Sequence, residues 1–403
     1  MDPLVIAVFA VVYLGMVLGG LPRLAIDRTG IAVLGAIVLV ASGRIDLAEA
    51  WRAIDVPTIA LLVGLMVVSA QLRLGGFYGL VTRRLARHEA TPDALLAVVI
   101  GAAGVLSALL VNDIVCLAMA PVLVEICARR ELEPRPFLLA LACAANVGSA
   151  ATLIGNPQNM LIGQALHLSF AGYLRDALPP TLLGLVVVWW VVRRSVGGRW
   201  AGATAVPVAQ GVRFDRWQTT KGLVVLAVVI ALFVATPWPR DLIALAAAGV
   251  LLVSRRTSSR ATLGQLDGQL LLLFIGLFVV NHTFSATGVP ARALADVAAQ
   301  GIDLRAPGWL FALTVLLSNL VSNVPAVMLL LPAATHPQAG AVLALASTLA
   351  GNLLVVGSIA NIIVVEQAAR LGVAIDWRTH ARVGVPVTLA TLAVAAAWLW
   401  VLS

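Results

Sequence analysis

Long apolar runs recur from one end of this chain to the other. The first, PLVIAVFAVVYLGMVLGGL from Pro3, has no charged residue in 19 positions and is long enough to cross a bilayer as a helix. Hydrophobic residues make up 61% of the 403 positions and charged residues 11%, whereas soluble proteins carry about 25% charged residues. The runs lack the alternation of barrel strands. The sequence therefore predicts an all-α polytopic membrane protein.

Ten of the apolar segments are predicted to be spans, and the basic residues cluster between them. The spans are 3–20, 30–42, 57–75, 136–166, 176–193, 222–236, 241–254, 269–288, 340–368 and 383–402. The net charge of +8 is thus a feature of membrane topology rather than of nucleic-acid binding. If these loops lie on the cytoplasmic side of a bacterial inner membrane, both termini are expected to be periplasmic. The basic loop residues are Arg83, Arg84, Arg87, Arg129, Arg130, Arg135, Arg193, Arg194, Arg199, Arg213, Arg216, Lys221, Arg255, Arg256 and Arg260.

Two further apolar regions, 93–128 and 308–335, are broken in the middle by polar residues. Their centres, LLVNDIVCL and NLVSNVPAV, contain no glycine-rich or charged connector of the kind that an exposed loop needs. We interpret both as re-entrant hairpins that enter from opposite faces and turn near the membrane midplane. Non-helical backbone at that depth is tolerated only where it is buried in protein or lines a cavity.

The two halves of the chain repeat the same elements in the same order. DVPTIALLVGLMVV resembles DGQLLLLFIGLFVV, VNDIVCLAMAP resembles SNVPAVMLLLP, and TLIGNPQNMLI resembles LVVGSIANIIV. Three such pairs in order are hard to obtain by chance. The matched positions are Asp55 with Asp267 and Gly64 with Gly276 at an offset of 212, Asn112 with Asn323 at 211, and Gly155 with Gly357 and Asn159 with Asn361 at 202.

Each half is predicted to contain five spans and one hairpin. Because five is odd, the second half is inserted upside down, which is the inverted-topology repeat of secondary transporters. We expect a first repeat over 1–200, a cytoplasmic linker over 201–221 and a second repeat over 222–403. The fourth span of each repeat, 136–166 and 340–368, is expected to be a broken helix.

Polar residues and glycines interrupt these two spans. Pro157 lacks an amide hydrogen and disfavours helix at Asn156. A helix unwound in mid-membrane leaves free N–H groups, which attract anions, and free carbonyls, which suit a hard cation such as sodium. The candidate substrate- and ion-binding residues are Asn112, Asp113, Asn146, Ser149, Thr152, Gly155, Asn156, Asn159, Ser322, Asn323, Ser347, Thr348, Asn352, Gly357, Ser358 and Asn361.

Asp113 is the one acidic residue that we place near the midplane, so it is the best candidate to bind a proton or a cation. A sodium ion could lie near Asn112, Asp113 and Asn323. The alternative is that these polar residues only cap helix ends or join helices. No cofactor is expected beyond the coupling ion. No metal-type cysteine pair and no hydrolase arrangement is legible, so the chain is not predicted to be an enzyme.

The segments LVNDIVCLAMAPVL, NVGSAATLIGNPQNMLI and STLAGNLLVVGSIANIIV resemble the ion transporter superfamily. They are most similar to its branch of arsenite permeases, NhaD-type sodium/proton antiporters and bacterial anion permeases, and the resemblance covers nearly the whole chain. It implies a homodimer in which a scaffold domain holds the interface. It also implies a transport domain that carries the hairpins and broken helices in an elevator-type movement.

One departure from the related divalent anion/sodium symporters concerns coupling. In that group, Ser-Asn-Thr triplets at both hairpin tips hold sodium and substrate, whereas this chain has Val111-Asn112-Asp113 and Ser322-Asn323-Val324. The asparagines carry over, but the first serine and both threonines do not. The Asn-Asp pair resembles the arsenite permease and antiporter branch and is compatible with proton coupling through Asp113.

The sequence therefore predicts a secondary transporter that is coupled to a proton or sodium gradient. Its substrate is expected to be a small anion or oxyanion, and an arsenite-like solute is one candidate. The alternative is a sodium/proton antiporter without an anion substrate, and a third class is a channel-like or receptor-type module. No G-x-x-x-x-G-K-[ST] nucleotide loop is present. A separate ATPase subunit, which some arsenite permeases use, is left open.

Overall fold

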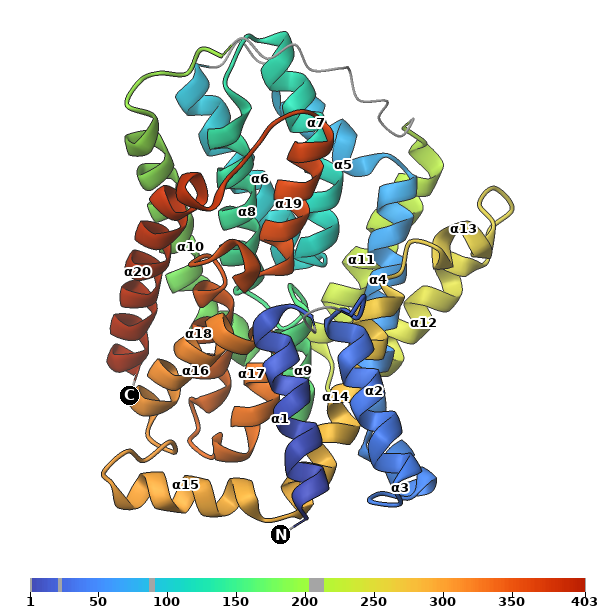
Figure 1. Cartoon of the computed structure of the whole chain (residues 1–403). Helices are drawn as coiled ribbons and strands as arrows, with labels where there is room; N and C mark the ends of the chain where they lie inside the picture. The colour runs from blue at the N-terminus through green and yellow to red at the C-terminus, as the bar shows by residue number, and fades with distance from the viewer. Residues whose placement is uncertain (1, 21–23, 87–90, 203–213, 403) are drawn as a thin grey trace.

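The computed structural model describes residues 2–20, 24–86, 91–202 and 214–402, which contain helices and connecting loops but no β-strand (Figure 1). The first half contains α1 Pro3–Leu18, α2 Arg28–Ala41, α3 Leu47–Ala53, α4 Val56–Leu74, α5 Phe77–Ala86, α6 Pro92–Leu109, α7 Asn112–Arg129, α8 Pro134–Ser149, α9 Pro157–Ala165 and α10 Phe170–Val196. The second half contains α11 Arg216–Ala235, α12 Arg240–Leu252, α13 Ser259–Leu263, α14 Gly268–Ala286, α15 Val289–Ala299, α16 Pro307–Val321, α17 Asn323–Leu330, α18 Ala339–Ala350, α19 Ile359–Arg370 and α20 Trp377–Leu402. The helices α1 to α10 correspond in order to α11 to α20.

The two halves are inverted with respect to each other. In Figure 1, the hairpin α6–α7 and helix α8 descend from the top, whereas the hairpin α16–α17 and helix α18 rise from the bottom. Six of the described helices, α4, α6, α10, α11, α14 and α20, are long and apolar enough to cross a membrane. The predicted all-α polytopic fold with two inverted repeats is therefore confirmed.

Helix caps explain one of the matched sequence pairs. Asp55 Oδ1 accepts a hydrogen bond from the backbone N–H of Thr58 at 2.9 Å. Asp267 Oδ1 accepts one from the N–H of Leu270, also at 2.9 Å. Each carboxylate satisfies an otherwise unpaired donor at the start of a helix, α4 in one repeat and α14 in the other. This aspartate pair is a structural feature of the repeat.

Reciprocal contacts join the repeats through two glycines. A Cβ atom added to Gly64 would lie 2.6 Å from Cβ of Ala244, and one added to Gly276 would lie 2.6 Å from the carbonyl carbon of Ala32. The glycines are 212 positions apart, and so are the alanines. Helix α4 therefore packs on α12 as α14 packs on α2, because only a residue without a side chain lets these backbones approach so closely.

Some element boundaries differ from the sequence prediction. Helices α5 and α15 were not predicted, because short helices of mixed polarity give no long apolar run, and α5 places Arg83 and Arg84 on a helix instead of in a loop. Helices α6 and α7, the two arms of the first hairpin, each have 18 residues. Arg87, Arg213 and most of the 201–221 linker lie outside the described residues.

Candidate functional site

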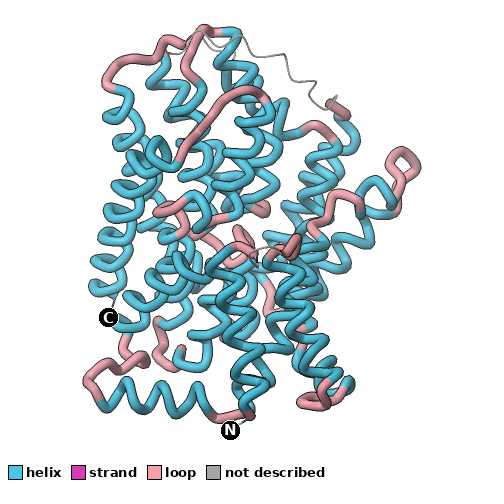
Figure 2. The backbone as a smooth tube through the Cα atoms, in the orientation of Figure 1, coloured by secondary structure: helices cyan, strands magenta, loops and turns pink. Residues whose placement is uncertain are grey.

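Two broken helices meet at the centre of the molecule. Helix α8 ends at Ser149 and α9 begins at Pro157, whereas α18 ends at Ala350 and α19 begins at Ile359. Figure 2 shows the intervening loops in pink at mid-height, surrounded by cyan helices. Asn156 has extended backbone angles of −152° and 161°, as expected for the residue before a proline. Both predicted interruptions are present.

Equivalent asparagines close both loops in the same way. The Asn159 side-chain amide donates to the carbonyls of the residues ten and seven positions before it, at 3.3 and 3.0 Å. Asn361 donates to the carbonyls ten and seven positions before it, at 2.8 and 3.1 Å. The unwound backbone therefore has the same hydrogen-bonded form in both repeats.

Asn146 joins the two repeats directly. Its side-chain N–H group donates to Asn352 Oδ1 at 2.8 Å and to Asn361 Oδ1 at 3.0 Å. Its Oδ1 accepts from Ser358 Oγ at 2.8 Å and from Asn112 Nδ2 at 3.3 Å. All five side chains are at most 5% exposed. One buried amide thus connects α8, both ends of the second break and the first hairpin tip.

Thr348 makes the matching connection in the opposite direction. It lies 202 positions after Asn146, and its Oγ1 donates to Asn159 Oδ1 at 3.3 Å. The same oxygen accepts from Asn156 Nδ2 and Gln158 Nε2, each at 3.2 Å. The contacts of Asn146 with the second loop are therefore mirrored by those of Thr348 with the first, and we call these residues together the central network.

The hairpin tips leave buried oxygen atoms without partners. The backbone N–H of Asn112 donates to the Gly155 carbonyl at 3.1 Å. The side-chain oxygens of Asn112 and Asn323 are buried and accept no hydrogen bond from the described residues, and neither do the hydroxyls of Ser107 and Ser318. An unpaired buried polar group costs about 1–3 kcal/mol. These pairs, each 211 positions apart, are acceptors available to a ligand.

Charge and strain occur beside the tips. Asp113 is half-buried and has no hydrogen bond or ion pair with a described residue, and the central network contains no arginine or lysine. Ser322 adopts φ 76° and ψ 161°, a region that is costly for any residue with a side chain. No group of three or more His, Cys, Asp or Glu residues within the described ranges could hold a metal ion.

The structure brings most of the predicted site residues together. Side-chain hydrogen bonds of the central network involve Asn112, Asn146, Ser149, Asn156, Asn159, Thr348, Asn352, Ser358 and Asn361. Thr152 donates to the Ala108 carbonyl and Ser347 to that of Ala344 in its own helix. Asp113, Gly155, Ser322, Asn323 and Gly357 contribute no side-chain hydrogen bond to the network. Binding by these residues stays a prediction.

Sequence reasoning missed several participants. Tyr173 donates to the Ala150 carbonyl at 2.7 Å, and the His380 ring lies 3.0 Å from the carbonyl of Asn352, the counterpart of Ala150. Single aromatic or imidazole residues in apolar helices give no spacing pattern that would identify them. Ser107 and Ser318 could have been found, because the offset that aligns Asn112 with Asn323 also aligns these serines.

Comparison with known proteins identifies the family. The family model CitMHS, described as citrate transporter, matches residues 13–350. The chain belongs to this family. The CitMHS chain is 30% identical to the silicon efflux transporter LSI3 of Oryza sativa subsp. japonica, over 96% of this chain and 95% of that one. It is 31% identical to the inner membrane protein YbiR of Escherichia coli, over 82% and 85% of the two chains.

Solved structures agree on the fold. The CitMHS chain matches the YdaH transporter of Alcanivorax borkumensis with a TM-score of 0.61 and 16% identity, over 99% of this chain and 96% of the other. It matches MtrF of Neisseria gonorrhoeae with a TM-score of 0.59 and 12% identity, over 98% and 93%. The expected resemblance to the ion transporter superfamily is confirmed. The chain is a multi-pass membrane transporter.

Proposed function

We propose that this chain is a secondary active transporter of a small oxyanion or its protonated oxyacid, arsenite-like in chemistry, in a bacterial inner membrane. The observation that carries the proposal is the uncharged central network of amides and hydroxyls between two broken helices. Such groups both donate and accept, so they suit a solute with several hydroxyl groups. A fully charged carboxylate substrate would favour a guanidinium or ammonium partner, which the network lacks.

The relatives support the same chemistry. A curated relative that is aligned over 96% of this chain is named a silicon efflux transporter. Hydrated silicon and arsenite-like solutes share a compact shape and a shell of hydroxyl groups. We propose transport by an elevator-type movement of a homodimer, with the hairpins and broken helices in the moving part.

Coupling is assigned to the first hairpin tip. Asp113 is half-buried, has no cationic partner among the described residues, and follows Asn112, whose side-chain oxygen is unpaired in the same part of the chain. A carboxylate in that position binds a proton or, with amide oxygens, a sodium ion. We therefore propose that a proton or sodium gradient drives the solute through this group.

A ligand screen followed by flux measurement tests the proposal. Purified protein is heated with arsenite, silicic acid, citrate or sodium, because a ligand of the folded state raises apparent stability with the logarithm of its concentration. We expect stabilisation by an oxyacid and gradient-driven flux in proteoliposomes without ATP. Stabilisation by citrate alone would contradict the proposed substrate class. A strict ATP requirement would point to a separate ATPase subunit.

The second candidate is a sodium/proton antiporter without an anion substrate. Asp113 and the unpaired oxygens of Asn112 and Asn323 favour it, because a carboxylate and amide oxygens are ligands for a small cation. The two candidate functions are distinguished by imposing a pH gradient across proteoliposomes that contain sodium and no oxyacid. Sodium-dependent proton flux without oxyacid would establish the antiporter.

A further inference from the structure

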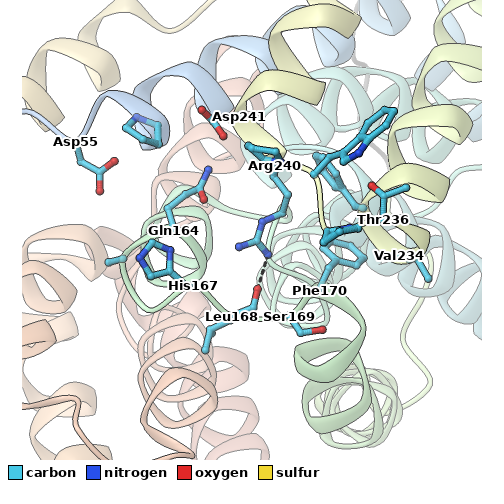
Figure 3. A pocket seen from close by; sticks show the side chains of 16 residues that line it. Asp55, Gln164, His167, Leu168, Ser169, Phe170, Val234, Thr236, Arg240 and Asp241 are labelled. Atoms are coloured by element: carbon cyan, nitrogen blue, oxygen red, sulfur yellow. Dashed lines mark hydrogen bonds between the residues drawn. The ribbon is translucent and has the colours of Figure 1, made fainter.

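A cavity of about 850 Å³ lies between the end of α9 and the neighbouring ends of α4, α11 and α12 (Figure 3). Its lining includes Asp55 before α4, Gln164 and His167 around the end of α9, Thr236 after α11 and Arg240 at the start of α12. Helix α9 belongs to the broken pair that forms the central network. Helices α4 and α12 pack on each other through Gly64 and lie outside that network. The cavity therefore marks a boundary between two parts of the molecule.

Arg240 crosses this boundary. Its Nη1 donates to the carbonyl of Leu168 at 2.8 Å (Figure 3). Its Nη2 donates to the carbonyl of Gly163 at 2.7 Å. Carbonyls at the end of a helix lack intrahelical donors and carry partial negative charge. Gly163 lies in the last turn of α9 and Leu168 in the loop after it, and the planar guanidinium reaches both carbonyls at once. Arg240, the first residue of α12, therefore holds the end of α9 in this conformation.

The inverted repeat supplies a counterpart for Arg240 and for the end of α9, but the counterparts are apart. Arg28, the first residue of α2, lies 212 positions before Arg240. The counterparts of Gly163 and Leu168 are Val365 and Arg370, 202 positions later, and Glu366 of α19 lies between them. Arg28 Nε donates to the Met16 carbonyl at 3.1 Å, within its own repeat. Glu366 is exposed and has no hydrogen bond or ion pair with a described residue. The contact exists in one repeat only.

In the elevator-type movement proposed above, the hairpins and broken helices move past the rest of the protein, and the two inverted repeats exchange conformations between the inward- and outward-facing states. We propose that Arg240 and Arg28 are alternating latches: Arg240 holds α9 in the state seen here, and Arg28 holds α19 through Glu366 in the opposite state. This rests on the alternating access in the proposed function. The latches are chemically unequal, because Arg240 binds backbone carbonyls, whereas Arg28 meets a carboxylate.

Distances between spin labels test the exchange without a known substrate. The pair Leu24→Cys and Ala369→Cys reports the approach of α2 to α19, and the pair Trp238→Cys and Ala165→Cys reports that of α12 to α9. All four positions are exposed, whereas the three native cysteines are buried and will label poorly. We expect two distance populations for each pair, with the short distance of one pair accompanying the long distance of the other.

Latch variants should shift these populations in opposite directions. Arg240→Ala should increase the population with α2 near α19 by about tenfold, the effect of ~1.4 kcal/mol between the states. Glu366→Gln should reduce it, and the exchange Arg28→Glu with Glu366→Arg should restore it. Arg292→Ala is the matched control, because Arg292 also donates to a backbone carbonyl, that of Thr287, but within one repeat. It should shift nothing.

Two results would overturn the latches: a 24–369 distance that is the same in every variant, or a shift of the same sign from Arg240→Ala and Glu366→Gln. Arg240→Gln repeats the test if the alanine variant does not elute as a single folded species. Flux in proteoliposomes is measured on the same proteins. Responsive distances without oxyacid flux would reject the proposed substrate and keep the latches, and flux with unresponsive distances would do the reverse.

Discussion

The two hairpin tips share one feature and differ in two. Residues 111–113 and 322–324 both present an asparagine whose buried amide oxygen has no partner in the described part of the chain. The first tip adds the carboxylate of Asp113 on relaxed backbone, with Val111 at φ −63° and ψ 120°. The second adds no charge, and Ser322 holds φ at 76°. The amide oxygens of the two tips are therefore equivalent, whereas the charge is found only at the first tip and the backbone strain only at the second.

The largest effect is expected from removing the charge that distinguishes the tips. Asp113→Asn should abolish the dependence of flux on the driving gradient, because an amide of the same shape cannot take up a proton or compensate a cation. Flux is measured in proteoliposomes with and without the imposed gradient. Val324→Asp at the second tip is the control, and it should not restore coupling to the Asp113→Asn protein. Unchanged coupling in Asp113→Asn would remove the proposed asymmetry.

Removing the amide that joins the repeats should cost the most stability. Asn146→Ala leaves Ser358, Asn352 and Asn361 short of a buried partner, and each unsatisfied group costs about 1–3 kcal/mol. Thr348→Val keeps the shape of the side chain and removes one hydroxyl, so its effect should be smaller. The apparent melting temperature in detergent measures both. A larger loss from Thr348→Val would mean that Asn146 does not organise the network.

The shared asparagines test the symmetry itself. Asn112→Ala and Asn323→Ala each remove one unpaired buried oxygen, so each should weaken ligand or sodium binding by about tenfold, or ~1.4 kcal/mol. Asn281→Ala is the comparison that should change binding less, because the Asn281 side-chain oxygen already accepts a hydrogen bond from Tyr13 at 2.8 Å. Binding is followed by the ligand-dependent shift in melting temperature. Strongly unequal effects of the first two variants would show that only one tip contacts the solute.

The smallest expected effect is at the strained serine. Ser322→Gly should stabilise the protein by about 1 kcal/mol, because glycine adopts this backbone region without a steric cost. Val111→Gly should destabilise it by more than that amount, because glycine adds freedom to the unfolded chain and the buried valine side chain, 2% exposed, is lost from the core. Melting temperatures of the two variants should thus move in opposite directions. A fall in both would show that Ser322 is not strained.

The sequence predicted the features that depend on short segments. The broken helix was predicted from Asn156 before Pro157, and the repeat was predicted from similar residues at nearly constant sequence offsets. Helix α5 was missed because its ten residues mix arginines with apolar residues. Tyr173 and His380 were missed because each acts on a carbonyl 23 or 28 positions away that no local pattern connects to it.

Hydropathy and helix breakers act over tens of residues, so the order of amino acids is enough to predict a membrane protein built from two inverted copies of one unit. The three-dimensional packing, in contrast, decided which amides pair across the copies, such as Asn146 with Asn361 at a separation of 215 positions. It also decided which oxygens are left unpaired and which arginine holds a broken helix. The physical reason is that a hydrogen bond depends on distance and angle to within a few tenths of an ångström, and those are set by the packing of all the helices together.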